Sequence, residues 1–383
     1  MISAGGLGAG VAAAVARAIG EGDMVRASRM AGQGLLLALV CAAVIAAGMF
    51  AFGAPLFSLM GAEGAVLELA LIYAGLVFGG GFAVWLMNIA ANVLRGTGNM
   101  AVPAAAIVIG EAGHLLLSPA LILGWGPLPQ LGIAGAGIGV LAAYGIGSVI
   151  LLGYLAAGRS LVRPGWRDLM PDPAGMKPVL RVGLFSGLNV LQFQFTTLVM
   201  TAFVGGYGAA TLAGFGAALR LELLQIPIVF AFGSAVIAMT ATNAGAGDMQ
   251  RVRRIVWSGA VVAAGIGAVF GAIALLLPGV WMRLLTDDPQ VIAAGQEYLT
   301  VVGGTLPMLG LALGLFFAAL GVGQVAAPFL LGLARLGLIA AGGGAALAFW
   351  QAEASTLYLI VAAAYVLYGL AMLWCVRRLL NRL

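Results

Sequence analysis

The chain has 383 residues, of which 63% are hydrophobic and only 8% are charged, and its formal net charge is +5. A soluble globular domain carries about 25% charged residues, so this composition, with a mean hydropathy of +1.11, excludes one. Apolar stretches of about 18 residues or more, long enough to cross a bilayer, recur along the whole chain. The sequence therefore predicts an all-α, polytopic membrane protein.

Eleven apolar stretches are predicted as transmembrane helices. The 60 glycines fit this class, because small residues let helices in a membrane approach closely. The two cysteines lie in different stretches and indicate no disulfide framework. In chain order the predicted helices cover residues 1–19, 32–60, 66–94, 101–124, 131–157, 180–205, 212–243, 255–285, 291–319, 326–349 and 355–380.

Basic residues indicate the orientation in the membrane. Of the 18 lysine and arginine residues, fifteen lie in alternate connections between predicted helices or near the C-terminus. The positive-inside rule places these connections, and with them the C-terminus, in the cytoplasm. The same bias indicates contact with anionic lipid of the inner leaflet and no nucleic-acid partner. The other connections carry acidic residues and one basic exception, namely Glu63, Asp287, Asp288, Glu353 and Arg283.

An internal repeat divides the chain. The longest connection, residues 158–181, separates a predicted N-lobe, 1–157, from a predicted C-lobe, 182–383. The segments RAIGEGDMVRASR and TNAGAGDMQRVRR, which begin at residues 17 and 242, align at an offset of 242 − 17 = 225, and the register continues to Pro103 and Pro328. Corresponding loops fall on the same side of the membrane, so the repeats are parallel, as in transporters that bind substrate between two halves.

The repeat also predicts a missing segment. The counterpart of the helix at 180–205 would begin near 180 − 225 = −45. The first of two six-helix lobes is therefore expected to lack its first helix and part of its second, which leaves about eleven helices instead of twelve. We interpret the chain as a truncated form or one whose start is assigned too late.

These segments resemble the MATE (multidrug and toxic compound extrusion) transporters, of the bacterial DinF-like branch. The paired loops are similar to that family's cytoplasmic loops, and further similar segments are VLRGTGNMAVP, SPALILGWGPLPQLGIAGAGIG, LRLELLQIPIVFAFG and LARLGLIAAGGG. The resemblance implies a monomeric exporter of the bacterial plasma (inner) membrane without a cofactor. It would exchange organic cations, other drugs or toxic metabolites for H⁺ or Na⁺ by alternating access of its lobes.

The family's usual coupling residues are not all present. Where the fifth helix often has an Asn-x-x-x-Asp-Pro pattern, this chain has His114, Ser118 and Pro119. A first-helix aspartate would lie in the missing segment. Phe193 stands where the sodium-coupled branch has a glutamate in its seventh helix. The coupling site therefore has to be sought among other polar residues inside the predicted helices.

One group of ion-coupling candidates lies in the fifth helix of the family pattern. Glu111, His114 and Ser118 follow one another at i, i+3 and i+7, on one helical face. A charged side chain at the centre of a membrane helix costs about 2.5–3.5 kcal/mol, so such residues usually face the bundle interior. A histidine beside a carboxylate could bind and release a proton near neutral pH. The alternative is a hydrogen-bonded packing pair.

Glu222 and Glu297 are the other ion-coupling candidates. With Arg220 they are expected at similar depth in the second lobe, and either Arg220 or Glu222 is expected to bond Glu297 directly. Such a pair could couple ions or be purely structural. Arg335 aligns with position 110, next to Glu111, and could pair with Glu111 to close the cytoplasmic side.

Further polar residues inside predicted helices are candidates for lining a substrate cavity. Their alternative role is to hydrogen-bond neighbouring helices, at about 0.6 kcal/mol each. The cavity candidates are Asn88, Asn92, Asn189, Gln192, Gln194, Thr196, Arg220, Gln225 and Arg335.

Missing motifs limit the energy source. The sequence contains neither GxxxxGK[ST] nor HExxH nor CxxC, so we expect no ATPase, no metal site and an ion gradient as the driver. Two alternatives remain open. One is a flippase for lipid-linked saccharides of the same superfamily, which would place more cationic side chains in its cavity. The other is an intramembrane enzyme using Glu111 and His114 as acid and base, which the duplicated architecture disfavours.

Overall fold

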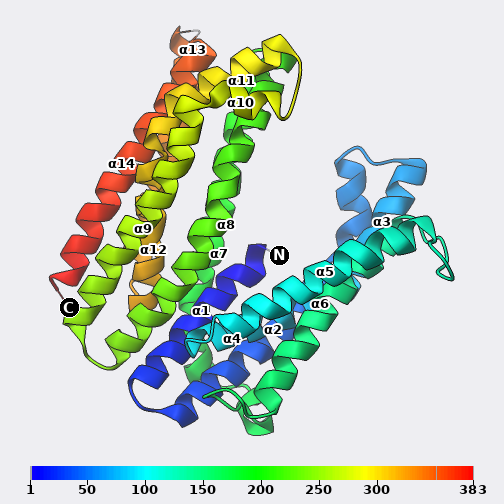
Figure 1. Cartoon of the computed structure of the whole chain (residues 1–383), viewed down its shortest axis with the longest axis vertical. Coiled ribbons are helices and arrows are strands. Elements are labelled where there is room, and N and C mark those ends of the chain that lie inside the picture. The colour runs from blue at the N-terminus through cyan, green and yellow to red at the C-terminus, as the bar shows by residue number, and fades with distance from the viewer. Residues whose placement is uncertain (1, 351, 383) are drawn as a thin grey trace. The chain divides into compact units, whose positions relative to one another are not determined.

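The computed structural model describes residues 2–350 and 352–382, except for the side chains of residues 2–4 and 174, and over these ranges the chain forms helices and loops without strands (Figure 1). The helices are α1 (Ile2–Gly20), α2 (Met24–Leu59), α3 (Gly64–Gly79), α4 (Gly81–Gly96), α5 (Ala101–Leu123), α6 (Ile133–Ala156), η1 (Trp166–Leu169), α7 (Pro173–Gly205), α8 (Ala209–Gly245), α9 (Met249–Leu276), α10 (Pro278–Arg283), α11 (Pro289–Val302), η2 (Gly303–Thr305), α12 (Leu306–Val322), α13 (Ala326–Trp350) and α14 (Ala354–Leu380).

The helices confirm the predicted class. Within the described part of the chain, nine helical segments are long and apolar enough to cross a membrane, or ten when the bent pair α3 and α4 counts as one span. α1 is a shorter apolar helix. Each of the eleven predicted stretches is helical over most of its length, so the protein is a polytopic, all-α membrane protein.

Three of the predicted spans are interrupted. Residues 66–94 form two helices that meet at Gly80 with a bend of 42°, in a run of three glycines that gives the backbone freedom to kink. Residues 255–285 divide at Leu277, since Pro278 cannot continue the hydrogen bonding of α9 and instead begins α10. The stretch 291–319 contains the 3₁₀ turn η2, after which Pro307 lies in the first turn of α12.

The repeat seen in the sequence recurs in the local geometry. Asp23 caps α2 by accepting the backbone N–H of Arg26 at 2.8 Å, and Asp248 caps α9 by accepting that of Arg251 at 2.9 Å. Both pairs are separated by 248 − 23 = 225 positions. The bend at Gly80 likewise corresponds to the 3₁₀ turn η2, which ends at position 305. The two repeats therefore share local structure as well as sequence.

The chain divides into two compact units, Met1–Gly183 and Leu184–Leu383. The connection predicted as a linker is fastened to unit 1. The Gln33 side chain of α2 donates to the carbonyls of Asp168 and Met170 at 2.7 and 2.6 Å and accepts the N–H of Asp172 at 3.0 Å. α7 already begins at Pro173, so the end of the predicted linker is helical and the predicted start of that helix at 180 is seven residues late.

α12 forms the centre of unit 2 and packs against α8, α9 and α14 (Figure 1). Close approach depends on glycines without a side chain in the way. A Cβ atom on Gly310 would lie 2.3 Å from the carbonyl oxygen of Ala263, and one on Gly267 would lie 2.4 Å from that of Leu306. α12 itself is packed tightly by small residues. The polar side chains described below lie on α7, α8, α11, α13 and α14.

A hydrogen bond outside the spans joins two loops of unit 2. The Tyr207 hydroxyl, between α7 and α8, donates to the carbonyl of Ala352, between α13 and α14. Burial, and then the nearby Glu353 carboxylate, raise the pKa of Tyr207 above its ordinary value. The phenol therefore stays protonated, and able to donate, throughout the physiological pH range.

Candidate functional site

A buried carboxylate lies in the interior of unit 2. Glu222 of α8 is 6% exposed. The hydroxyl of Tyr298, from α11, donates to its Oε2 at 2.7 Å, and the hydroxyl of Tyr365, from α14, donates to its Oε1. Three helices therefore converge on one acidic group, whose two oxygens are both hydrogen-bonded and which forms no ion pair with the described residues.

Aromatic rings surround this carboxylate. Tyr298 contacts Phe215 and Tyr358 edge-to-face, each with ring centroids 5.1 Å apart, and Phe215 stacks on Tyr358 at 6.4 Å. Such aromatic pairs contribute about 0.5–1.5 kcal/mol beyond the burial of their area. The rings hold Tyr298 in place, so its hydroxyl is preorganised to donate to Glu222.

Arg335 of α13 is the second buried charge in unit 2, at 3% exposure. Its guanidinium carbon lies 3.9 Å from the ring centroid of Phe193, 5.1 Å from that of Tyr368 and 5.8 Å from that of Tyr365. None of its three side-chain nitrogens has a hydrogen-bond partner among the described residues. Cation–π contacts therefore replace hydrogen bonds around this cation, and Tyr365 contacts both buried charges.

Amide side chains continue the polar interior. Gln192 on α7 and Gln225 on α8 are buried, and neither end of either amide has a partner among the described residues. Asn189 is buried with its Oδ1 in the same state. α13 approaches this group at Gly332, where a Cβ atom would lie 2.8 Å from the Gln192 Oε1. An unpaired buried polar group costs about 1–3 kcal/mol, so a cluster of them is expensive for packing and suits a polar ligand.

A small cavity of about 30 Å³ adjoins the carboxylate. That volume holds a water molecule or a monatomic cation. Oxygen-bearing side chains contribute to its wall, together with Phe193 and other apolar groups. The oxygen-bearing residues are Gln194, Thr196, Thr197, Glu222, Tyr298 and Tyr365.

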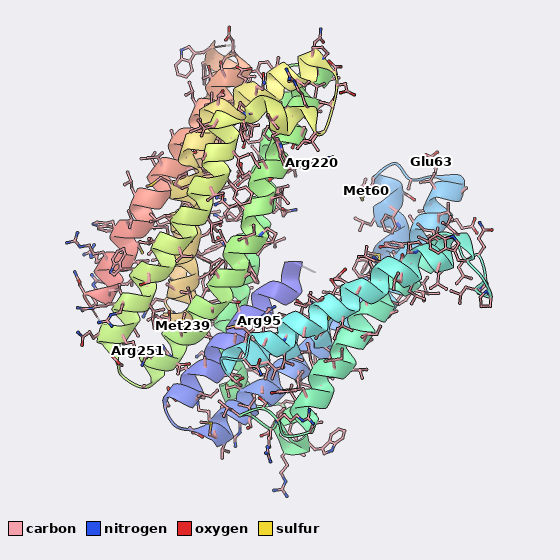
Figure 2. All side chains as sticks on the ribbon, in the orientation of Figure 1. Met60, Glu63, Arg95, Arg220, Met239 and Arg251 are labelled. Atoms are coloured by element: carbon pink, nitrogen blue, oxygen red, sulfur yellow. The ribbon has the colours of Figure 1, made fainter. Side chains whose placement is uncertain are left out.

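The predicted pairing of Glu297 is wrong. Glu297 and Arg220 are both exposed, and Arg220 is labelled on α8 in Figure 2. No ion pair in the described part of the chain involves either of them or Glu222. Tyr298, one residue further along α11, turns inward in place of Glu297 and reaches Glu222. Successive helical residues are rotated by about 100°, so the buried face of α11 includes Tyr298 and leaves Glu297 outside.

The candidates in α5 share a helix but do not form a bonded relay. Glu111 is exposed, His114 is half-buried and Ser118 is buried. Ser118 packs against Gly139 of α6. A Cβ atom added to Gly139 would lie 2.7 Å from the Cβ of Ser118. The buried Nδ1 of His114 has no hydrogen-bond partner among the described residues, so the predicted carboxylate–histidine pair is not hydrogen-bonded through that atom. Glu111 and Arg335 belong to different units, and their pairing stays a prediction.

Three of the other cavity candidates, Asn88, Asn92 and Thr196, hydrogen-bond within their own helices. The amide of Asn88 donates to the carbonyl of Val84 at 2.9 Å, and that of Asn92 donates to the carbonyl of Asn88 at 2.8 Å. The Thr196 hydroxyl donates to the carbonyl of Gln192 at 2.9 Å, also within one helix. Gln194 is exposed. These donors therefore satisfy their own helices, and the predicted alternative of bonds between neighbouring helices is not seen for them.

The tyrosines of this cluster are absent from the residues selected by sequence. A signal for them exists in α14, where Tyr358, Tyr365 and Tyr368 stand at i, i+7 and i+10 and share one face. Three tyrosines on one face of an apolar helix indicate that this face is turned to the bundle interior, where Tyr365 reaches Glu222. Tyr298 on α11 offers no comparable pattern.

The fold and this interior define a class. Charged and amide side chains that face the interior of a bundle of membrane-spanning helices are typical of a membrane transporter. The family model described as MatE matches residues 1–120 and 186–344. The chain belongs to the MatE family, as the paired loops and helices predicted, and it is a transporter rather than an enzyme.

Curated relatives extend over most of the chain. A protein named "FAD transporter" from Shewanella oneidensis is 29% identical over 313 residues, which cover 80% of this chain and 68% of that protein. A protein named "Probable multidrug resistance protein NorM" from Deinococcus radiodurans is 30% identical over 349 residues, covering 88% of this chain and 75% of the relative.

Solved structures share the fold. One, described as "Outward-facing conformation of a multidrug resistance MATE family transporter of the MOP superfamily", superposes with a TM-score of 0.92 at 22% identity and covers 100% of this chain and 85% of that one. Another, "Crystal structure of MATE in the bent conformation", gives 0.92 at 23% identity, covering 100% and 84%. At these identities the likeness concerns the fold alone.

Proposed function

We propose that this protein exports small organic compounds, drugs or toxic metabolites, from the cytoplasm in exchange for H⁺ or Na⁺. The observation that carries the proposal is Glu222, a buried carboxylate whose oxygens accept hydrogen bonds from two tyrosine hydroxyls and which forms no ion pair in the described part of the chain. An ionisable group within the bilayer marks an ion or substrate pathway by default. The family, and relatives named for multidrug resistance, support the same direction of transport.

Glu222 serves as the coupling carboxylate in this proposal. A proton or Na⁺ from the outside neutralises it, with the adjoining cavity of about 30 Å³ able to hold the bare ion. Tyr365 then has a weaker acceptor for its hydroxyl, and its ring also contacts Arg335. Ion binding at Glu222 thereby changes the surroundings of Arg335, which lets ion and cargo compete. The two units alternate access to the two sides.

The topology in this proposal follows the arginine distribution. The ends of α1, α8 and α14 carry or adjoin the basic connections, and the positive-inside rule favours the cytoplasm for them and for the C-terminus. We infer a monomer in the plasma membrane. In this orientation Glu222 lies within the membrane, where cargo arrives from the cytoplasm and the coupling ion arrives from the outside.

Two kinds of cargo are candidates. A cationic organic compound would be attracted by Glu222 and by aromatic rings such as Phe215. An anionic aromatic compound is favoured by Arg335, a buried guanidinium without a hydrogen-bond partner among the described residues that lies over Phe193. The relative named as an FAD transporter supports testing the second kind. Ethidium and FAD are suitable probes of the two.

Proteoliposomes test the proposal. The purified chain is reconstituted, a pH gradient or a Na⁺ gradient is imposed separately, and movement of ethidium and of FAD is followed. We expect transport of one of them to depend on one gradient and to fall at least tenfold in Glu222→Gln. The matched control, Glu297→Gln, changes an exposed carboxylate on α11 and is expected to transport normally. Gradient-dependent transport that survives in Glu222→Gln contradicts the assigned role.

A further inference from the structure

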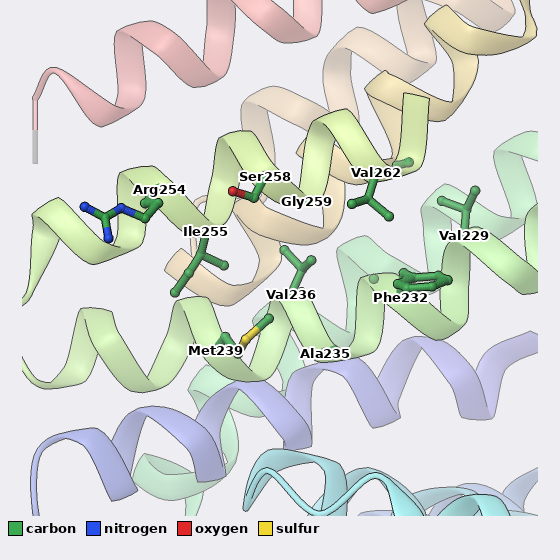
Figure 3. Close-up of a pocket in the computed structure, with 13 residues that line it drawn as sticks. Val229, Phe232, Ala235, Val236, Met239, Arg254, Ile255, Ser258, Gly259 and Val262 are labelled. Atoms are coloured by element: carbon green, nitrogen blue, oxygen red, sulfur yellow. The ribbon is translucent and has the colours of Figure 1, made fainter. Parts of the chain in front are cut away.

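An apolar groove lies between α8 and α9 of unit 2, and its lining shares no residue with the cavity beside Glu222 (Figure 3). Its volume is about 330 Å³, at the small end of the range for ligand pockets. Phe232, Val236 and Met239 line it from α8, and Ile255 and Val262 line it from α9. The lining is almost entirely aliphatic and aromatic, so the groove suits a hydrocarbon chain.

The length of the groove matches one leaflet of a bilayer. Its lining residues on α9 extend from Arg254 to Ala263, nine steps of about 1.5 Å, or about 14 Å along the helix. Half of the hydrocarbon core of a bilayer is about 15 Å. Both helices are membrane spans. An occupant with one end at Arg254 would therefore extend from the edge of the hydrocarbon region to about the middle of the bilayer.

The groove is open along its side. Phe232 and Met239 are about half exposed in unit 2, and Val262 is 43% exposed. Aliphatic and aromatic side chains that line an open groove on a membrane span face lipid tails or a cavity that tails can enter. An acyl chain can therefore enter laterally.

One end of the groove is strongly basic. Arg254 stands at that end and its side chain extends beyond the groove (Figure 3). The Arg253 guanidinium donates to the carbonyl of Leu380 at 2.8 Å, and that of Arg378 lies 5.2 Å from the Trp374 ring. No hydrogen bond or ion pair described for the chain engages the Arg254 guanidinium.

The surrounding charges have one sign. The loop between α8 and α9, the first two turns of α9 and the C-terminal end of the chain from residue 377 contribute six arginines and one acid. The acid is Asp248, whose carboxylate caps α9 by accepting the backbone N–H of Arg251. These arginines are Arg251, Arg253, Arg254, Arg377, Arg378 and Arg382. An anionic headgroup at this end meets attraction from several sides.

We propose that the groove between α8 and α9 binds an acyl chain of an anionic phospholipid whose phosphate is held by Arg254. The occupant has an apolar part as long as one leaflet and an anionic part at the basic end, which phospholipids of the cytoplasmic leaflet combine. This inference rests on the proposed orientation of the basic end, but it does not depend on which cargo or ion is transported.

Photolabelling in nanodiscs tests the site. The full chain is reconstituted with phosphatidylglycerol that carries a diazirine in one acyl chain, or with the matching phosphatidylcholine, and the labelled peptides are identified by mass spectrometry. We expect label on the groove residues of α8 and α9 with phosphatidylglycerol. Arg254→Gln is expected to reduce it about fivefold, the factor for one arginine near an anionic surface. The matched control Arg283→Gln changes an exposed arginine of α10, which is neither in the groove lining nor in this basic cluster, and is expected to retain most of the label.

Filling the groove gives an independent variant. Val262→Trp places an indole in the groove, whereas Val261→Trp places it at the neighbouring position, which is 68% exposed and outside the lining. We expect at least a tenfold loss of label in the first and little change in the second. Both variants are compared with the unmodified chain by thermal unfolding.

Several outcomes overturn the proposal. Absence of label from the groove in the unmodified chain does so without any variant. Equal labelling by the two lipids, unchanged in Arg254→Gln, removes the headgroup role. Displacement of the label by ethidium or FAD assigns the groove to cargo, and crosslinks between groove residues of two copies assign it to a dimer. Because labelling is measured without transport, failure here is distinct from failure of the proposed export.

Discussion

Removal of the Tyr365 hydroxyl tests the central hydrogen bond of unit 2. Tyr365→Phe deletes one of the two donors to Glu222 and leaves the ring over Arg335. A hydrogen bond to a charged group contributes about 1.5–3 kcal/mol. Glu222 is 6% exposed, so water has little access to replace the lost donor. We therefore expect the free energy of unfolding to fall by that amount.

A double-mutant cycle isolates the interaction. The free energy of unfolding is measured by denaturant titration in mixed detergent micelles for Tyr365→Phe, Glu222→Gln and the double variant. We expect a coupling energy of about 1–3 kcal/mol for Tyr365, and a similar value for Tyr298, whose hydroxyl also donates to the carboxylate. Tyr358→Phe is the control, because its buried hydroxyl has no partner among the described residues.

The control defines the refuting result. Coupling between Tyr358 and Glu222 is expected to stay within about 0.5 kcal/mol. If the couplings of Tyr365 and Tyr298 are no larger than that of Tyr358, the hydroxyls do not hold the carboxylate and its assignment as an oriented coupling group fails.

Three further predictions concern the scaffold. Gly267→Ala forces a Cβ against the Leu306 carbonyl and should destabilise the protein by about 1–3 kcal/mol in thermal unfolding, whereas Gly265→Ala, which meets nothing within 4 Å, should cost less than about 0.5 kcal/mol. Asp248→Ala removes the cap of α9 and should cost about 0.5–2 kcal/mol, seen as faster amide exchange in its first turn. Gln33→Leu breaks three hydrogen bonds to the connection between the units and should speed its cleavage by trypsin; unchanged cleavage contradicts the anchoring.

Hydropathy predicted the helices well because a span must satisfy its backbone internally over about 20 apolar residues. It missed the interruptions of the helices at Gly80 and Pro278. These residues hardly change a hydropathy average over 18 residues, although each changes the course of the backbone. The arginine-flanked loops at 17–29 and 242–254 gave the repeat and the family. The glycines and prolines that interrupt these helices are visible in the sequence, but they have to be considered residue by residue and not as part of an average.

The site was predicted less completely. Polar residues inside helices, such as Glu222, Gln225 and Arg335, could be selected from the sequence because their burial is expensive. Their partners could not, because helical periodicity fixes which residues share a face but not which face meets a neighbouring helix. Glu297 and Tyr298 differ by one position, and only packing decides that the tyrosine reaches Glu222. Tyrosines also pass unnoticed in a hydropathy profile, since their rings suit an apolar span.

Ion release on cargo binding tests the central claim most directly. The purified chain in weakly buffered detergent solution receives the cargo that moves in proteoliposomes, and released H⁺ or ²²Na⁺ is measured. The account predicts release of one ion by the unmodified chain and by Glu297→Gln, and none by Glu222→Gln. Equal release by Glu222→Gln, with cargo binding intact, would contradict the assignment of Glu222 as the group where ion and cargo compete.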